Sequence, residues 1–183
     1  MKKILFTIVF LAAALMFAKA QDPIPVEATV EFNKTQVPGI SLLLSSYSID
    51  VVQGAISARF ETLKSSKAKG CYKAYVSQRF SDFSSMNIDI YVFAETRGKN
   101  SKDLVTLSIA ISKGNNNFAT ADNDPEIYQN VKNFLTDFNR YLFEYNVKLQ
   151  IADENLKIQN LLKDISKLTG EATKLRKNIA ETE

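Results

Sequence analysis

A long stretch without proline at the C-terminus constrains the fold of this chain more than any other feature. No proline follows Pro125, and Gly170 is the only glycine beyond it. Asp124, Pro125 and Glu126 together are typical of a helix start, with a capping aspartate, a proline in the first helical position and an acid near the positive helix end. A helix over 125–180 would be about 84 Å long. That length exceeds the width of a small globular head.

The predicted helix carries two different apolar patterns along its length. Up to Tyr145 the apolar residues recur at helical spacing, which indicates packing on a sheet. From residue 151 a second pattern repeats every seven residues, with isoleucine at heptad position a and leucine three residues later at position d. That choice favours a parallel two-stranded coiled coil, although Glu154 occupies the first d position. The residues predicted to form the contact are Ile151, Ile158, Leu161, Ile165, Leu168, Ala172, Leu175 and Ile179.

This second apolar row is longer than one small head can cover, and large uncovered apolar patches on soluble proteins usually mark interaction sites. We therefore expect the row to bind a second copy of the chain, giving a homo-oligomer that is most simply a dimer. Packing on another envelope protein is an alternative. A hairpin broken around residues 169–170 and a frayed tail are further alternatives, and Gly170 would lie at an outward position of the coiled coil.

Alternating apolar and polar residues predict the first strand of the head. Residues 26–32 alternate with period two, as in a strand with one buried face. Gln36–Gly39 interrupts this pattern, and its Pro-Gly pair is turn chemistry. The short apolar run Ile40–Leu44 is consistent with a second strand at the edge of the sheet.

A helix and three further strands are predicted in the middle of the chain. Ser48 is a plausible N-cap, and Val52, Ile56 and Phe60 lie on one face of the helix that would follow it. Gly54 would weaken this helix, and its small size would allow close packing on a sheet. Because the next strands are joined by short connections, we expect an antiparallel meander. These strands are predicted at residues 71–80, 88–94 and 105–111.

The predicted fold class is therefore α+β, in the order β-α-β-β-β-α. It comprises an antiparallel sheet of about four strands with one packed helix, followed by a long C-terminal helix with coiled-coil character. We expect a signal peptide at 1–20, an α+β head at 21–146 that includes the first half of the long helix, and a helical tail at 147–183.

The N-terminal segment predicts export. Two lysines, an apolar run over residues 4–17 and the small-x-small sequence Ala18-Lys19-Ala20 match a secretory signal peptide. The apolar run is short for a membrane span, so we expect cleavage before Gln21 and no integral membrane segment afterwards. An uncleaved anchor is the alternative. The expected location is periplasmic or secreted.

Charge and cysteine content narrow the partners further. The formal net charge of +3 comes from the three lysines of the export segment, because the processed chain would hold 23 − 3 = 20 basic and 20 acidic residues. That balance argues against nucleic acid as a partner. Cys71 is the only cysteine, so no disulfide forms within a chain, and we expect it to be a small buried residue of a strand.

The residue types that carry most catalysis are scarce. The chain has no histidine and no glycine-rich phosphate loop, and we expect no cofactor, no metal and no catalytic residue. Asp122–Asp124 lacks the spacing of an EF-hand, and helix capping accounts better for Asp124. A hydrolase that pairs two of Asp82, Asp89 and Glu95 is an unfavoured alternative. A carrier with a small apolar ligand on an aromatic sheet face is another alternative, and the residues of that face would be Tyr72, Tyr75, Tyr91 and Phe93.

The chain resembles exported proteins of Gram-negative bacteria that combine a small α+β domain with a C-terminal helical tail and whose function is not known. The export segment, Phe32-Asn33-Lys34 through Val37-Pro38, and Lys69-Gly70-Cys71-Tyr72 carry this resemblance. It implies no activity and transfers no functional residue. We therefore expect a non-enzymatic interaction or scaffold protein of the cell envelope.

Overall fold

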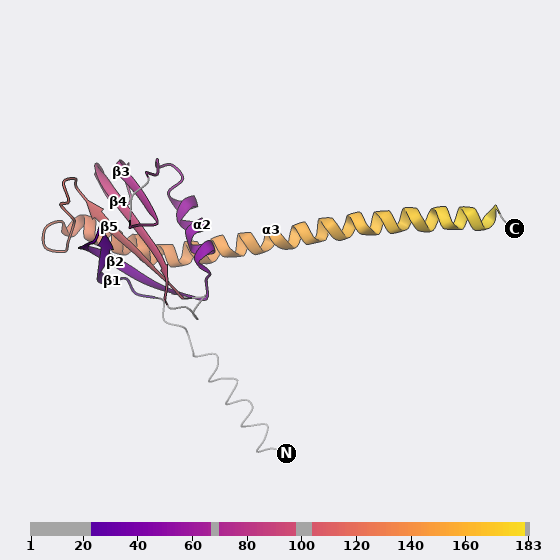
Figure 1. Ribbon diagram of the computed structural model, residues 1–183, viewed down its shortest axis with the longest axis horizontal. Helices are drawn as coiled ribbons and strands as arrows, with labels where there is room; N and C mark the ends of the chain where they lie inside the picture. The colour runs from indigo at the N-terminus through magenta and orange to yellow at the C-terminus, as the bar shows by residue number, and fades with distance from the viewer. Residues whose placement is uncertain (1–22, 67–69, 98–103, 182–183) are drawn as a thin grey trace, which may run out of the picture.

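Strands and helices follow one another in the order β-β-α-β-β-β-α, and the long helix projects far beyond the rest of the molecule (Figure 1). The computed structural model describes residues 23–66, 70–97 and 104–181, so the predicted signal peptide lies outside the described residues. The elements are β1 (Val26–Phe32), β2 (Thr35–Ser45), α2 (Ile49–Arg59), β3 (Lys73–Phe80), β4 (Ser84–Thr96), β5 (Leu104–Ser112) and α3 (Pro125–Ala180).

The strands form one antiparallel five-stranded sheet in the order β1-β2-β5-β4-β3. The meander expected for the last three strands is confirmed, since β4 pairs with both β3 and β5. The predicted α+β class is confirmed as well. β2 differs from the expectation, because it pairs with β5 as well as with β1 and is therefore an internal strand.

The first hairpin turns at a different place from the one predicted. Asn33 and Lys34 form the turn, with φ values of 52° and 64°. Two successive positive φ angles suit a two-residue hairpin turn whose twist matches that of the strands. The predicted turn Gln36–Gly39 instead belongs to β2. Proline is tolerated there because the register between β2 and β5 begins only at Ile40.

The main core lies between one face of the sheet and the two helices. Ser48 caps α2 as predicted, because its hydroxyl oxygen accepts a hydrogen bond from the backbone N–H of Val51 at 3.4 Å. Val52 and Ile56 of α2 are buried, and so is Phe60 directly after it. From the other helix, Leu135 and six further residues are buried: Ile127, Tyr128, Val131, Phe134, Phe138 and Leu142.

The other face of the sheet carries a smaller cluster of aromatic side chains. Phe32, Tyr91, Phe93 and Phe118 are buried together there, and the ring centroids of Phe32 and Tyr91 lie 4.3 Å apart. Cys71 packs against this cluster as a half-buried residue just before β3, and burial raises the pKa of its thiol. Both faces of the sheet are therefore partly covered, although helices cover only one.

The predicted start of α3 is confirmed, but Asp124 does not cap the helix through its side chain as predicted. Asp124 is the N-cap residue, yet its side chain makes no capping hydrogen bond. One carboxylate oxygen of Asp124 instead accepts a hydrogen bond from the ammonium of Lys113 at 2.7 Å. Pro125 occupies the first turn as expected, and the helix continues without interruption to Ala180.

Candidate interaction surface

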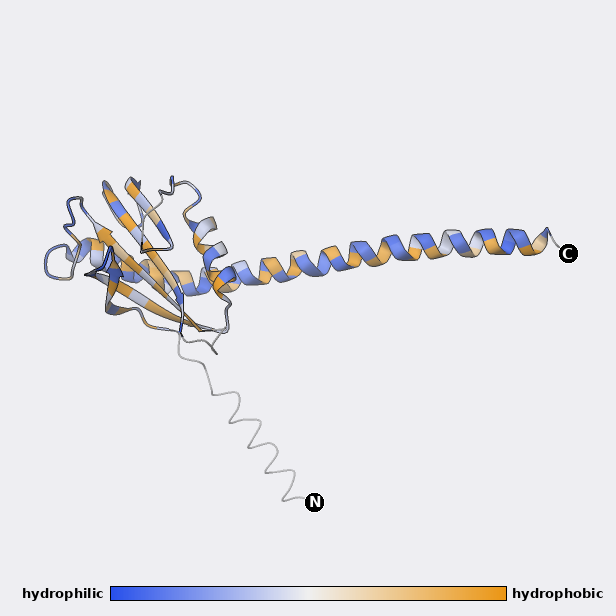
Figure 2. Cartoon of the chain, in the orientation of Figure 1, coloured by the Kyte–Doolittle hydropathy of each residue, from blue (hydrophilic) through white to orange (hydrophobic). Residues whose placement is uncertain are grey.

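The long helix leaves the head soon after its last fully buried residue. Leu142 is completely buried, and Tyr145 is half-buried. From Lys148 to the end of the described chain every residue is exposed. Figure 2 shows apolar residues recurring along this projecting part, between polar ones. More than thirty residues of helix thus stand in solvent, and each of their apolar side chains is exposed.

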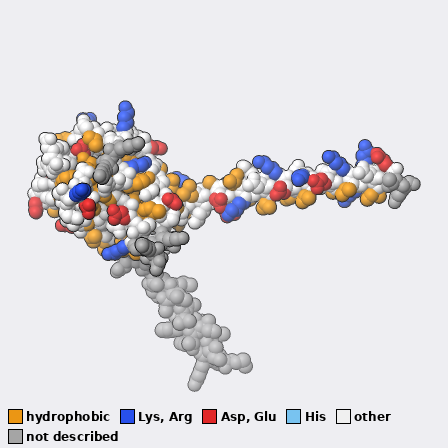
Figure 3. All heavy atoms as spheres, in the orientation of Figure 1, with side chains coloured by type: hydrophobic (Ala, Val, Ile, Leu, Met, Phe, Trp, Pro, Cys, Tyr) orange, Lys and Arg blue, Asp and Glu red, His pale blue; other side chains and the backbone are white. Residues whose placement is uncertain are grey.

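The exposed part presents the predicted heptad positions in a single row. We call this row the seam, and its isoleucine and leucine side chains are between 53% and 63% exposed. In Figure 3 the hydrophobic side chains of the tail gather mainly along one edge, and most of its lysine and arginine side chains lie along the other. The seam comprises Ile151, Ile158, Leu161, Ile165, Leu168, Ala172, Leu175 and Ile179.

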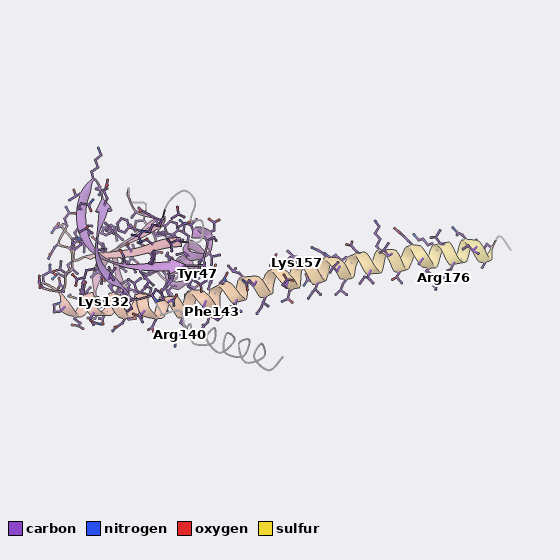
Figure 4. All side chains as sticks on the ribbon, turned by 90° about the horizontal axis from the view of Figure 1, so that it is seen from below. Tyr47, Lys132, Arg140, Phe143, Lys157 and Arg176 are labelled. Carbon is purple, nitrogen blue, oxygen red and sulfur yellow. The ribbon has the colours of Figure 1, made fainter. Side chains whose placement is uncertain are left out.

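The seam does not continue the stripe with which α3 packs on the head. Leu135 and Ile151 are sixteen positions apart, as are Leu142 and Ile158. Sixteen residues at about 100° each leave a rotation of about 160° beyond whole turns. Leu161, at a d position, is nineteen positions from Leu142, which leaves about 100°. The near end of the seam therefore faces between about 100° and 160° away from the buried leucines. Figure 4 shows Arg140 on the side of α3 that points away from the head, which is the side the seam continues.

Lys157 forms an ion pair with Glu154, the acidic residue that interrupts the seam. The ammonium nitrogen of Lys157 lies 2.8 Å from a carboxylate oxygen of Glu154, which occupies the first d position. The same nitrogen lies 2.7 Å from a carboxylate oxygen of Asp153. Hydrogen bonds to Asp153 and Glu154 raise the pKa of Lys157. The interruption is thus partly neutralised within the chain.

Several exposed apolar residues of α3 were not among the predicted contact residues. Phe143 is 59% exposed and lies near the line of the seam, at the junction with the head. Leu149 and Leu156 continue the seven-residue spacing of the buried Leu135 and Leu142 beyond the head, where they too are exposed. That continued spacing was the sequence signal for a second, head-facing line of leucines.

The four aromatic residues predicted as a ligand surface do not share one face of the sheet. Tyr75 is 1% exposed and belongs to the main core between sheet and helices. Tyr72 is half-buried against the same core, whereas Tyr91 and Phe93 lie in the cluster on the opposite face. Tyr91 and Phe93 are themselves buried at 9% and 4% exposure. Little ring surface remains for a ligand.

The hollow between the sheet and the long helix is also too small for a ligand. Between β2, β5 and α3, the space lined by Ile40, Ile109 and Val131 measures about 10 Å³. An apolar ligand site needs a few hundred Å³. Larger hollows, of about 480 and 500 Å³, lie beside the β1–β2 hairpin and on the outer face of the sheet, and both are open to solvent. The hollow found between sheet and helix among the described residues is thus far smaller than a carrier of an apolar ligand would need.

Two of the acidic residues considered for hydrolysis lie far apart, and the third pairs with an arginine. Asp89 and Glu95 lie six residues apart on β4, which corresponds to about 20 Å along a strand. Asp82 forms an ion pair with Arg59 at 2.7 Å. Within the described ranges, no group of three or more histidine, cysteine or acidic side chains is placed to hold a metal ion. Asp89 and Glu95 are therefore too far apart to act as a pair of catalytic carboxylates.

Comparison with known proteins adds no further constraint. No family model, curated protein or solved structure matches this chain. Among the described residues, no helix has both the length and the apolarity that a membrane crossing requires. The function must therefore be argued from the molecule's own surfaces, of which the seam is the most distinctive.

Proposed function

We propose that this chain is an exported, non-enzymatic interaction or scaffold protein of the cell envelope, periplasmic or secreted, that self-associates through the seam. In this proposal the head is a compact module and the distal half of α3 joins two copies. The observation that carries it is the seam itself. Seven isoleucine and leucine side chains recur at heptad positions on a helix that extends beyond the reach of its own head, and each is more than half exposed.

Solvent exposure of the seam costs free energy that a contact would recover. Burying apolar surface is worth about 25 cal/mol per Å² removed from water. A row of isoleucine at a and leucine at d is the pattern whose knobs fit the holes of a second helix. The head cannot supply that second helix, because it covers a different side of α3. A second copy of the chain supplies one with the same pattern.

The proposal is tested with two leucines that differ only in their side of the helix. Leu161 lies in the seam and Leu156 on the head-facing line, and they are 61% and 56% exposed. In sedimentation equilibrium, the wild-type protein should have the mass of a dimer. Leu161→Asp should raise the dissociation constant by at least about 100-fold, because each copy then places a carboxylate in the contact.

The matched variant Leu156→Asp should keep the dissociation constant within about threefold of the wild type. A wild-type protein that stays monomeric at the highest concentration measured would overturn self-association. Equal behaviour of the two aspartate variants would show that the seam is not the contact.

Export is the second part of the proposal and has its own test. It is supported by residues 1–20, whose charged start, apolar run and Ala-Lys-Ala end have the composition of a secretory signal. Protein recovered from a periplasmic or culture-medium fraction should begin at Gln21 when its N-terminus is sequenced. Protein found only in the cytoplasmic fraction with Met1 retained would refute the envelope location.

A further inference from the structure

Charged side chains flank the seam, and two of them form no ion pair with another described residue. Glu171 directly precedes seam residue Ala172, and Arg176 directly follows seam residue Leu175. Neither forms an ion pair with another described residue, whereas Lys157 and Lys177 both pair with acids of their own chain. Figure 4 shows Arg176 standing out from the tail in solvent. In heptad terms Glu171 is at position g and Arg176 at position e.

We propose that the partner is a second copy bound parallel and in register, with Glu171 of each chain paired to Arg176 of the other. This inference rests on the proposed function and adds the register of the two copies and the charged pair that fixes it. In a parallel coiled coil, the g residue of one helix lies beside the e residue five positions later on its partner. Glu171 and Arg176 are five positions apart, so the two-fold axis forms this attractive pair twice.

The opposite orientation pairs like charges. When two antiparallel copies overlap over residues 158–175, position g faces position g, and Asp164 of each chain lies beside Glu171 of the other. That arrangement makes two repulsive pairs and leaves Arg176 without an acid. The charges beside the seam therefore select the parallel pair over this antiparallel one.

The position of the head is compatible with the parallel pair. Because the near end of the seam faces between about 100° and 160° away from the buried leucines of α3, the partner helix runs along a side of α3 that the head does not cover. Two heads then lie at the same end of the coiled coil, one on each outer side. The exposed ring of Phe143 lies close to the line of the seam, where it would extend the contact toward the heads. The result is a two-headed rod.

Charge reversal tests the paired residues. Glu171→Arg alone and Arg176→Glu alone each turn two attractive pairs into two repulsive ones, so each should raise the dissociation constant about tenfold at low salt. An equimolar mixture of the two variants should form a heterodimer about as stable as the wild type, because both pairs become attractive again. Lys174→Glu, at an outward position, is the matched control and should change the dissociation constant by less than threefold.

Disulfide cross-linking tests the register separately. In a Cys71→Ser background, Leu168→Cys places the two thiols in one layer of a parallel in-register pair, so mild oxidation should give a covalent dimer. In the antiparallel pair position 168 faces position 165, and the same variant should remain uncrosslinked. A protein that is dimeric in sedimentation but shows neither the cross-link nor recovery on mixing would overturn the parallel arrangement and leave the proposed function intact. A monomeric wild-type protein would overturn both.

Discussion

Gly54 of α2 and Tyr145 of α3 meet where the long helix leaves the head, and a Cβ at position 54 would lie 2.7 Å from the hydroxyl oxygen of Tyr145. A glycine inside a helix costs about 1 kcal/mol relative to alanine. The contact explains why a glycine stands here despite that cost, because only a glycine lets the tyrosine ring approach so closely. The sequence predicted close packing of Gly54 on a sheet, but the neighbour is the other helix. This contact lies close to the point where α3 loses its support from the head.

A double-mutant cycle between Gly54 and Tyr145 measures this contact. In a Tyr145→Ala background, Gly54→Ala should stabilise the protein by up to about 1 kcal/mol through helix propensity alone. In the wild-type background the gain should be smaller, because the new methyl group forces the tyrosine ring to shift. Urea unfolding of the four proteins gives the coupling. Equal effects of Gly54→Ala in both backgrounds would show that the two residues do not constrain each other.

The same substitution should have opposite signs at two other glycines. At Gly39, a Cβ would lie 3.0 Å from the backbone oxygen of Ile109, which is held in the centre of the sheet. Gly39→Ala should therefore cost about 1–2 kcal/mol of unfolding free energy. At Gly170 nothing lies within 4 Å, so Gly170→Ala should make the tail more helical, by up to about 1 kcal/mol.

Thermal unfolding followed by circular dichroism measures both changes, with the wild type as reference. A Gly39→Ala protein as stable as the wild type would show that β2 and β5 have room to separate. An unchanged or lower helix content in Gly170→Ala would contradict the propensity argument.

Local signals were enough to predict α3 but not the first hairpin. The bounds 125–180 followed from one helix start and from the lack of any later proline. Pro38 and Gly39 are typical turn residues, so the sequence predicted an interruption between strands there. In the structure both residues lie within β2. The real turn contains Lys34 at a φ of 64°, a conformation that few lysines adopt, so residue preference alone would not place it there.

In the candidate site, too, the sequence predicted local features but not those that depend on tertiary packing. The residues of the seam could be listed from the sequence, because a seven-residue repeat is a property of one segment, and their role as a contact stays a prediction. The direction it faces relative to the head was not predicted, since that depends on which residues of α3 the sheet buries. The placement of Tyr75 and Tyr91 on opposite faces also depends on the sheet, because both are buried and alternation alone does not tell one covered face from another.

Two tyrosines should ionise at a higher pH than an exposed tyrosine. Burial, with a contribution from Tyr72, raises the pKa of Tyr75 to about 12. Burial and the nearby carboxylate of Glu27 raise the pKa of Tyr128 to about 12. An unfolded tyrosine ionises near pH 10, so the unfolded chain releases these protons first and stability falls as the pH rises from about 10 toward 12. Below about pH 10 this contribution is fully present.

Absorbance titration at 295 nm should therefore show a fraction of tyrosines that ionises only as the protein unfolds. Tyr128→Phe should remove one late-titrating group and make stability less dependent on pH above about 10. If all seven tyrosines ionised together near pH 10 in the folded protein, the two hydroxyls would be more open to solvent than their burial indicates.

Glu154 should weaken the proposed coiled coil, and replacing it should strengthen self-association. At the first d position of a parallel pair, the two Glu154 carboxylates oppose each other, and Lys157 of the same chain offsets each only in part. Glu154→Leu extends the apolar row by one layer, so the dissociation constant should fall at least about tenfold. Asp153→Leu is the matched control, because Asp153 also pairs with Lys157 but lies at an outward position. It should not tighten the dimer in sedimentation equilibrium. If both leucine variants tightened the dimer equally, added hydrophobicity rather than the seam would account for the association.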